Sequence, residues 1–191
     1  MEQKEIPCVL VFNKSDLASE EEKQTLRDIY KNSGCEILFI SAKQDEGIEA
    51  IREVLRGKTS TVAGPSGVGK SSLINKLQTD VNMETGSISE KIERGKHTTR
   101  HTEFIPIGED TFIMDTPGFS SLAVFDMEKE ELEQFYPEFN EYRDTCRFNG
   151  CSHTHEPGCG VKEAIEEGKI SKERYENYKL IYEELKNKKK Y

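Results

Sequence analysis

The chain has 191 residues, 34% of them hydrophobic and 33% charged, which is enough for one full domain and a small appendage. Its formal net charge of −9 does not favour general binding to nucleic acid, so contact with RNA would need a local basic patch. The sequence has no apolar run of about eighteen residues and no basic-then-apolar start, and we therefore expect a cytoplasmic protein without a membrane span.

Two apolar runs near the start, Val9–Phe12 and Ile37–Ile40, predict buried parallel strands. Between them, a capping box at Ser19–Glu22 begins a helix that Gly34 ends. A second helix follows, which Asp45 can cap at its N-terminus. The apolar face of that helix consists of Ile48, Ile51 and Leu55.

A β-branched run, Thr59–Ala63, predicts a third strand that leads into the glycine-rich segment 64–71. A helix from Lys70 to about Leu77 should follow this segment. Farther on, Phe104–Ile107 and Thr111–Met114 predict a hairpin. The alternation of strands and helices indicates an α/β fold.

The second part of the chain, from about residue 121, has a different pattern. An acidic helix is followed by a loop with cysteines and histidines, and then by more helix. Ser171 can cap the last helix. Its apolar face, which we expect to be core packing, consists of Tyr175, Tyr178, Tyr182 and Leu185.

The segment Gly64–Ser71 fits the pattern G-x-x-x-x-G-K-[ST] in the strand–loop–helix context that a phosphate-binding loop requires. In such a loop the backbone N–H groups cradle nucleotide phosphates, Lys70 reaches the β- and γ-phosphates, and Ser71 can ligate Mg²⁺. The residues that we expect to bind the phosphates are Gly64, Pro65, Ser66, Gly67, Val68, Gly69, Lys70, Ser71 and Ser72.

Two further motifs at strand ends predict that the base is guanine. In the N-K-x-D motif, Asp16 can accept hydrogen bonds from the guanine N1–H and 2-amino groups, which adenine cannot offer. Asn13 and Lys14 would brace this loop and cover the base, while the S-A-K motif would place a backbone N–H near the guanine oxygen. The combination predicts a GTP site, whose base-binding residues are Asn13, Lys14, Ser15, Asp16, Ser41, Ala42 and Lys43.

The residues that would meet Mg²⁺ and the γ-phosphate follow the phosphate loop. Asp115, at a strand end, can hold Mg²⁺ through water, and the Gly118 N–H can meet the γ-phosphate. A switch threonine would complete the Mg²⁺ shell, and we favour Thr99 over Thr98. The predicted magnesium ligands are Ser71, Thr99 and Asp115.

The catalytic residue is less clearly marked. Many GTPases place a glutamine that orients water directly after the glycine of D-x-x-G, but this chain has Phe119 there. His97, beside the switch threonines, is the best substitute, and the alternative that it is only a loop residue stays open. We expect the isolated chain to hydrolyse GTP slowly.

A metal site is predicted by the pattern C-x4-C-x-H-x5-C within residues 146–159. Three thiolates and one imidazole form a closed tetrahedral set for Zn²⁺, with no position left open for catalysis, so the metal should be structural. His155 is the rival for the fourth position. The predicted ligands are Cys146, Cys151, His153 and Cys159.

The motifs also come in a rotated order, because N-K-x-D and S-A-K precede the phosphate loop that opens an ordinary GTPase domain. NKSD, SAK, GPSGVGKSS, RGKHTTR and DTPGF, followed by the cysteine and histidine pattern, closely resemble the circularly permuted ribosome small-subunit-dependent GTPases, the RsgA (YjeQ, EngC) family. The match covers essentially the whole chain.

This resemblance implies GTP hydrolysis that the small ribosomal subunit stimulates late in that subunit's maturation. It also implies a zinc-binding module that contacts the ribosome, and His97 as a proposed catalytic residue. We therefore expect residues 1–122 to form a circularly permuted Ras-like P-loop GTPase domain and residues 123–191 a small α-helical zinc-binding domain. The expected partners are GTP and GDP, the small subunit and its rRNA, with no membrane, and we expect a monomer.

The chain departs from the family pattern at its start. The resemblance implies an N-terminal OB-fold and a six-stranded GTPase sheet, but this sequence has no OB-fold and only five predicted strands. The sixth strand would lie between the phosphate-loop strand and the N-K-x-D strand. We therefore expect a truncated chain with a gap between those two strands.

Two other functions are weighed against this one. The first is a non-catalytic, zinc-dependent rRNA- or ribosome-binding module with a degenerate nucleotide site, which Phe119 favours. The second is a permuted GTPase that acts on the large subunit or elsewhere, against which the metal-binding pattern after DTPGF argues.

Overall fold

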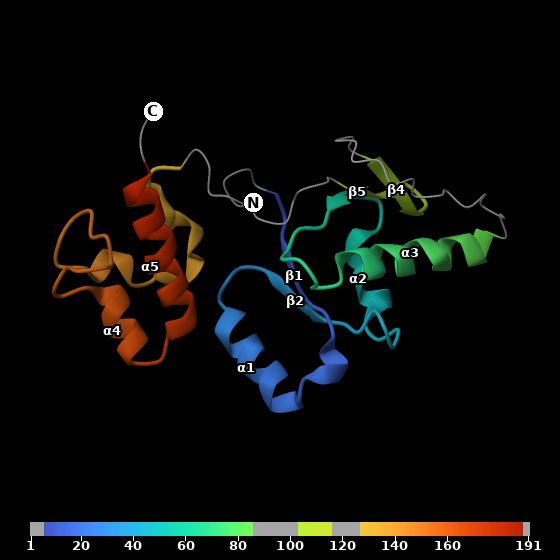
Figure 1. The fold of residues 1–191 in the computed structure, drawn as a ribbon. Coiled ribbons are helices and arrows are strands. Elements are labelled where there is room, and N and C mark those ends of the chain that lie inside the picture. The colour runs from blue at the N-terminus through green and yellow to red at the C-terminus, as the bar shows by residue number, and fades with distance from the viewer. Residues whose placement is uncertain (1–5, 86–102, 116–126, 189–191) are drawn as a thin grey trace. The chain divides into compact units, whose positions relative to one another are not determined.

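Figure 1 shows the computed structural model of the chain, which describes residues 6–85, 103–115 and 127–188. The chain divides into two compact units, which we call the first and the second unit. The first consists of Met1–Leu10, Ser19–Ile37 and Val124–Tyr191, and the second of Val11–Ala18 and Leu38–Ala123.

Strands β1 (Val9–Phe12) and β2 (Glu36–Phe39) form a two-stranded sheet. The Ile40 N–H donates to the Phe12 carbonyl at 2.9 Å, and the Ser15 N–H donates to the Ile40 carbonyl at 2.9 Å. The prediction that both strands are buried is confirmed only at Ile40, which is fully buried, since the residues of β1 and β2 themselves are half-buried or, at Glu36, exposed. Within the described residues each of these two strands pairs only with the other, so one edge of each has no neighbouring strand to cover it.

The other three described strands form a separate sheet in the order β3-β5-β4. β3 (Thr59–Thr61) is parallel to β5 (Thr111–Asp115), and β4 (Glu103–Gly108) pairs with β5 as the predicted antiparallel hairpin. Within residues 6–85 and 103–115, no ladder joins β1 to β3. This separation agrees with the gap expected between the N-K-x-D strand and the phosphate-loop strand.

Of the two predicted N-caps of the first two helices, one is confirmed and the other was wrong. Ser19 and Glu22 form the predicted capping box of α1 (Glu20–Tyr30). The N-cap of α2 (Ile48–Leu55) is Gly47, with φ 72°, and not Asp45. A side chain at position 47 would come within 2.6 Å of a backbone oxygen, and the Asp45 carboxylate instead forms an ion pair with Lys76 at 2.8 Å.

The core of the second unit lies between α2, α3 and the β3-β5-β4 sheet. Helix α3 (Lys70–Thr85) follows the phosphate loop and is longer than predicted. Its buried residues pack against buried isoleucines of α2, β4 and β5. This core consists of Ile40, Ile48, Ile51, Leu73, Ile74, Leu77, Ile105, Ile107 and Ile113.

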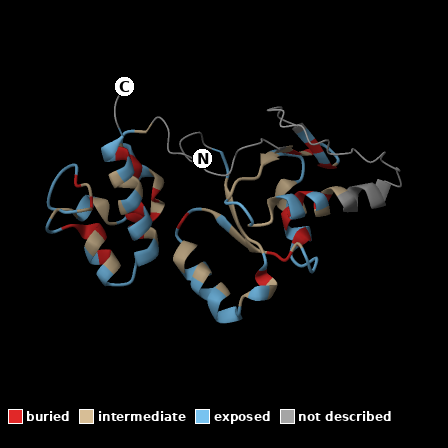
Figure 2. Cartoon of the chain, viewed as in Figure 1, coloured by how far each residue is buried: buried red, intermediate tan, exposed pale blue. Residues whose placement is uncertain are grey.

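The C-terminal part of the first unit has short elements and a separate core. The 3₁₀ helices η3 (Lys129–Phe135), η4 (Pro137–Phe139) and η5 (Arg143–Thr145) precede α4 (Gly160–Glu166) and α5 (Lys172–Asn187). Buried and exposed residues alternate along α5 (Figure 2), as its amphipathic pattern predicts. The core residues include Leu132, Tyr136, Phe139, Val161, Ala164, Ile170, Tyr175, Tyr178 and Leu185.

None of the helices in the described part of the chain combines the length and apolar character needed to cross a membrane.

Candidate functional site

Asn13 connects the three nucleotide-binding motifs of the second unit. Its side-chain Nδ2 donates to the Val68 carbonyl of the phosphate loop at 2.9 Å. Its Oδ1 accepts from the Ala42 N–H at 3.2 Å and from the Lys14 N–H at 2.8 Å. A single amide therefore fixes the N-K-x-D loop, the S-A-K loop and the phosphate loop against one another.

The other residues of the N-K-x-D loop also contact the neighbouring loops. Lys14, at φ 65°, donates through Nζ to the Gly67 carbonyl at 2.8 Å. Ser15 is buried, while Asp16 is half-buried and accepts a long hydrogen bond, 3.4 Å, from the Gln44 amide. The Asp16 carboxylate is thus available beside the loop that Asn13 and Lys14 brace.

The Lys70 side chain folds back onto the backbone of the phosphate loop. The Lys70 ammonium donates to the carbonyls of Gly64, at 2.6 Å, and of Pro65, at 2.9 Å. Ser71 and Ser72 are exposed in the first turn of α3, where backbone N–H groups and the helix dipole favour an anion. The first turn of α3 would therefore offer preformed donors to a nucleotide phosphate, while the Lys70 ammonium is bonded to carbonyls of its own loop.

Strand β5 leads toward the same end of its sheet as the phosphate loop. Met114 pairs with Thr61 in the parallel β3–β5 ladder, so the backbone of Asp115 comes next to the point where the chain leaves β3. The side chain of Asp115 lies outside the described part of the structure. So do the candidate catalytic residue His97, the switch threonines Thr98 and Thr99, the γ-phosphate residue Gly118, and Phe119, which stands in place of the catalytic glutamine.

We expect Gly69→Ala to destabilise the second unit. Gly69 has φ 99°, and a Cβ there would collide with Nδ2 of Asn13. The residue would carry about 1–3 kcal/mol of backbone strain, and Asn13 would lose its bond to Val68, worth about 1 kcal/mol. Urea denaturation should show a lower free energy of unfolding than in the wild type.

Gly57→Ala is the matched control for this prediction. Gly57 also has a positive φ, 67°, but a Cβ there would have no atom within 4 Å. Gly69→Ala should therefore cost about 1 kcal/mol more than Gly57→Ala. Equal costs for the two variants would show that the Asn13 contact contributes nothing.

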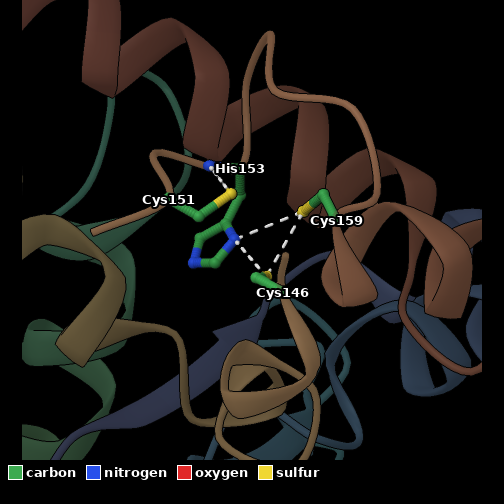
Figure 3. A group of neighbouring side chains, drawn as sticks. All are labelled: Cys146, Cys151, His153 and Cys159. Atoms are coloured by element: carbon green, nitrogen blue, oxygen red, sulfur yellow. Dashed lines mark hydrogen bonds between the residues drawn. The ribbon is translucent and has the colours of Figure 1, made fainter. Parts of the chain in front are cut away.

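The first unit holds a compact cluster of metal-binding side chains (Figure 3). One ligand atom from each of four residues lies within 4.8 Å of all the others. The Nδ1 atom of His153 is 3.6 Å from the Cys146 sulfur and 3.4 Å from the Cys159 sulfur, and those sulfurs are 3.8 Å apart. The cluster consists of Cys146, Cys151, His153 and Cys159.

Local backbone geometry brings these residues together. Gly150 and Gly158 have φ values of 70° and 65°, and the Arg147 N–H donates to the Gly158 carbonyl at 2.9 Å, which closes the loop. His153 itself has φ 56°. The α5 helix supports this unusual backbone, because the Tyr175 hydroxyl donates to the His153 carbonyl at 2.7 Å.

The chemistry of the cluster suits a soft divalent cation. Burial raises the pKa of the Cys151 thiol to about 12, and burial also raises the pKa of Cys159. A cation at the centre would stabilise the thiolates instead, so binding would release protons. Three sulfurs and one ring nitrogen are a ligand set typical of structural zinc sites.

The RsgA GTPase family model matches residues 1–125 of the chain, which include every described motif of the second unit. The chain belongs to the RsgA GTPase family. This result confirms the resemblance expected from the order of the motifs.

Curated and solved relatives extend the match to the C-terminal part of the first unit. The small ribosomal subunit biogenesis GTPase RsgA of Agathobacter rectalis is 62% identical over 191 residues, which are 100% of this chain and 63% of that protein. The crystal structure of YjeQ from Thermotoga maritima has a TM-score of 0.76 and 38% identity, over 98% of this chain and 63% of that one. The crystal structure of YloQ, a circularly permuted GTPase, has a TM-score of 0.72 and 31% identity, over 96% of this chain and 58% of that one.

The RsgA comparisons and the structure together confirm the predicted fold class, an α/β circularly permuted GTPase fold with a cysteine and histidine cluster. The chain spans 63% of the length of the Agathobacter relative. Of the two candidate histidines, His153 lies in the cluster and is buried, while the His155 side chain is 81% exposed.

Sequence reasoning missed one polar residue beside the cysteine and histidine cluster of this RsgA-family chain. The Glu133 carboxylate lies 2.7 Å from Nε2 of His153. Glu133 belongs to η3 and precedes the first cysteine of the pattern by 13 positions. It stands among several other glutamates, so neither its spacing nor its residue type marked it.

Proposed function

We propose that the second unit binds GTP and that the protein hydrolyses it to GDP and phosphate. The observation that carries this proposal is the set of Asn13 hydrogen bonds, which brings the base-reading and phosphate-binding loops together. The names of the relatives, which are GTPases, support the same conclusion.

Each proposed role follows from the chemistry of the residue. Asp16 reads the guanine donors, Lys70 neutralises the β- and γ-phosphates, and Ser71, Thr99 and Asp115 would hold Mg²⁺. The ion would supply positive charge to the phosphates. Gly118 would meet the γ-phosphate, and His97 is the candidate for the catalytic residue. The remaining contacts would come from Asn13, Lys14, Ser15, Ser41, Ala42, Lys43, Gly64, Pro65, Ser66, Gly67, Val68, Gly69 and Ser72.

For the cluster in the first unit, we propose one structural Zn²⁺ held by Cys146, Cys151, His153 and Cys159. Their ligand atoms lie within 4.8 Å of one another, and four such ligands would leave no position for a reacting water. We assign the GTPase domain to residues 1–122 and the zinc-binding helical domain to residues 123–191.

The proposed partner is the small ribosomal subunit and its rRNA. The relatives are named for the biogenesis of that subunit, and we propose that this chain acts late in its maturation as a monomer in the cytoplasm. The net charge of −9 makes a local contact, rather than a general attraction to RNA, the expected mode of binding.

The test is GTP turnover by the chain with and without purified small subunits. We expect slow hydrolysis alone and faster hydrolysis with subunits. Lys70→Ala should lower the stimulated rate about 10²–10³-fold, because one preorganised positive charge is lost from the transition state. Lys31→Ala removes the same charge from the exposed C-cap position of α1 and should not change the rate.

A rate that small subunits leave unchanged would overturn the proposal. In that case a non-catalytic ribosome-binding module becomes the better description, as the phenylalanine at position 119 already suggests. Co-sedimentation with small subunits in the absence of hydrolysis would be its signature.

A further inference from the structure

The two ring nitrogens of His153 have different surroundings. Nδ1 faces the sulfurs of Cys146 and Cys159, at 3.6 and 3.4 Å. The other ring nitrogen, Nε2, points away from the sulfurs in Figure 3 and lies 2.7 Å from the Glu133 carboxylate. The His153 side chain is 1% exposed and that of Glu133 is 30% exposed.

This geometry selects one tautomer of a neutral imidazole. An ionised carboxylate can only accept hydrogen bonds, so Nε2 has to carry the hydrogen. The lone pair of Nδ1 is then directed at the sulfur cluster, where a metal ligand is needed. The opposite tautomer would place two acceptors 2.7 Å apart and point an N–H at the metal position.

Two aromatic rings also pack against His153. Phe139 packs edge-on against the His153 ring with centroids 5.6 Å apart, and Tyr178 lies at 6.3 Å. These rings restrict the position of the imidazole, but they do not distinguish its two nitrogens by hydrogen bonding. Among the described residues, the carboxylate that contacts Nε2 is that of Glu133.

We propose that Glu133 is a positioning residue for the metal centre: it accepts the Nε2–H of His153 and thereby holds Nδ1 as the ligand atom. This role rests on the proposed zinc at the cluster. A carboxylate in this position also makes the imidazole a stronger donor to the metal, and loss of such a partner typically costs about 10–100-fold in metal affinity.

The first test is zinc affinity, measured by competition with a chelating dye. Glu133→Ala should bind zinc about 10–100-fold more weakly than the wild type. Glu133→Gln should lose less, because its amide oxygen still accepts a hydrogen bond. Glu130→Gln, on the same short helix and beside Lys129 rather than a metal ligand, should keep the wild-type affinity.

The second test observes the histidine directly by NMR of the zinc-loaded, ¹⁵N-histidine-labelled chain. We expect His153 to show a slowly exchanging Nε2–H and a metal-bound Nδ1. In Glu133→Gln the Nε2–H signal should move upfield, since a neutral acceptor forms a weaker hydrogen bond. A role in packing alone would leave this signal unchanged.

The outcomes separate the two proposals. A wild-type chain that binds no zinc would overturn the metal site and the role of Glu133 together. A wild type that binds one zinc, with unchanged affinity and an unchanged Nε2–H signal in Glu133→Gln, would overturn only the role of Glu133. A His153 ring whose Nδ1 carries the hydrogen and whose Nε2 binds the metal would also overturn only the role of Glu133.

Discussion

Cys151→Ala should abolish zinc binding and unfold the C-terminal part of the first unit. Three of the elements there, η3, η4 and η5, are short 3₁₀ helices, and α4 has 7 residues. Such pieces are not stable alone. The buried Cys151 and Cys159 are themselves part of the core, so whatever holds the cysteines together also holds these short elements together.

The proposed zinc would supply stability to these elements. Structural zinc contributes about 10–16 kcal/mol in small zinc-binding peptides, which equals or exceeds the whole free energy of unfolding of many domains, about 5–15 kcal/mol. We therefore expect zinc stoichiometry to fall from one to zero, with loss of the helical circular dichroism of α4 and α5. Treatment of the wild type with a strong chelator should give the same spectrum.

Cys35→Ala is the matched control for this experiment. Cys35 is half-buried, and it lies outside the cluster that the metal would occupy. Its removal should leave one zinc bound and the spectrum unchanged. Full zinc stoichiometry in Cys151→Ala would contradict the assigned ligand set.

The sequence predicted best those features that depend on chemistry at fixed spacing. The capping box of Ser19 and Glu22 needs two residues three apart, and it is present as predicted. The four cluster residues needed only a loop with tight turns, which Gly150 and Gly158 provide. In both cases a few neighbouring residues determine the geometry, so local sequence is sufficient.

The features that were mispredicted or missed depend on contacts between distant segments. Asp45 has a residue type suited to capping α2, but its carboxylate forms an ion pair with Lys76 on α3, and Gly47 is the N-cap. Val9–Phe12 reads as a buried strand by hydrophobicity, yet its burial depends on which strands lie beside it. Glu133 reaches His153 only through the folded chain, and no periodicity predicts such a contact.

Asp16→Asn should reverse the base preference of the nucleotide site from guanine to xanthine. The carboxylate can accept both the N1–H and the 2-amino group of guanine, whereas an asparagine amide offers one acceptor and one donor group. Its NH₂ group would face a donor of guanine. In xanthine a carbonyl oxygen replaces the 2-amino group, so the same NH₂ group would find an acceptor.

The expected size of the effect follows from the groups left without partners. One guanine donor loses its acceptor, and the asparagine NH₂ group that faces it has no acceptor either, so two unpaired donors cost about 1–3 kcal/mol each, or about 2–6 kcal/mol together. Affinity for GTP should therefore fall about 30-fold to 10⁴-fold, while affinity for xanthosine triphosphate rises. Competition binding with both nucleotides and with ATP measures the change, and ATP should remain a poor ligand of either form.

Asp28→Asn provides the control for charge, because it makes the same substitution at an exposed position on α1. It should leave the preference for GTP intact. Asn13 holds the loop of Asp16 against the phosphate loop through Val68, and Asp16→Asn leaves that hydrogen bond in place. Affinity for the phosphates should therefore survive in Asp16→Asn, and inorganic triphosphate should bind both forms equally. Equal losses for GTP, xanthosine triphosphate and triphosphate would mean that position 16 supports the loop and does not read the base.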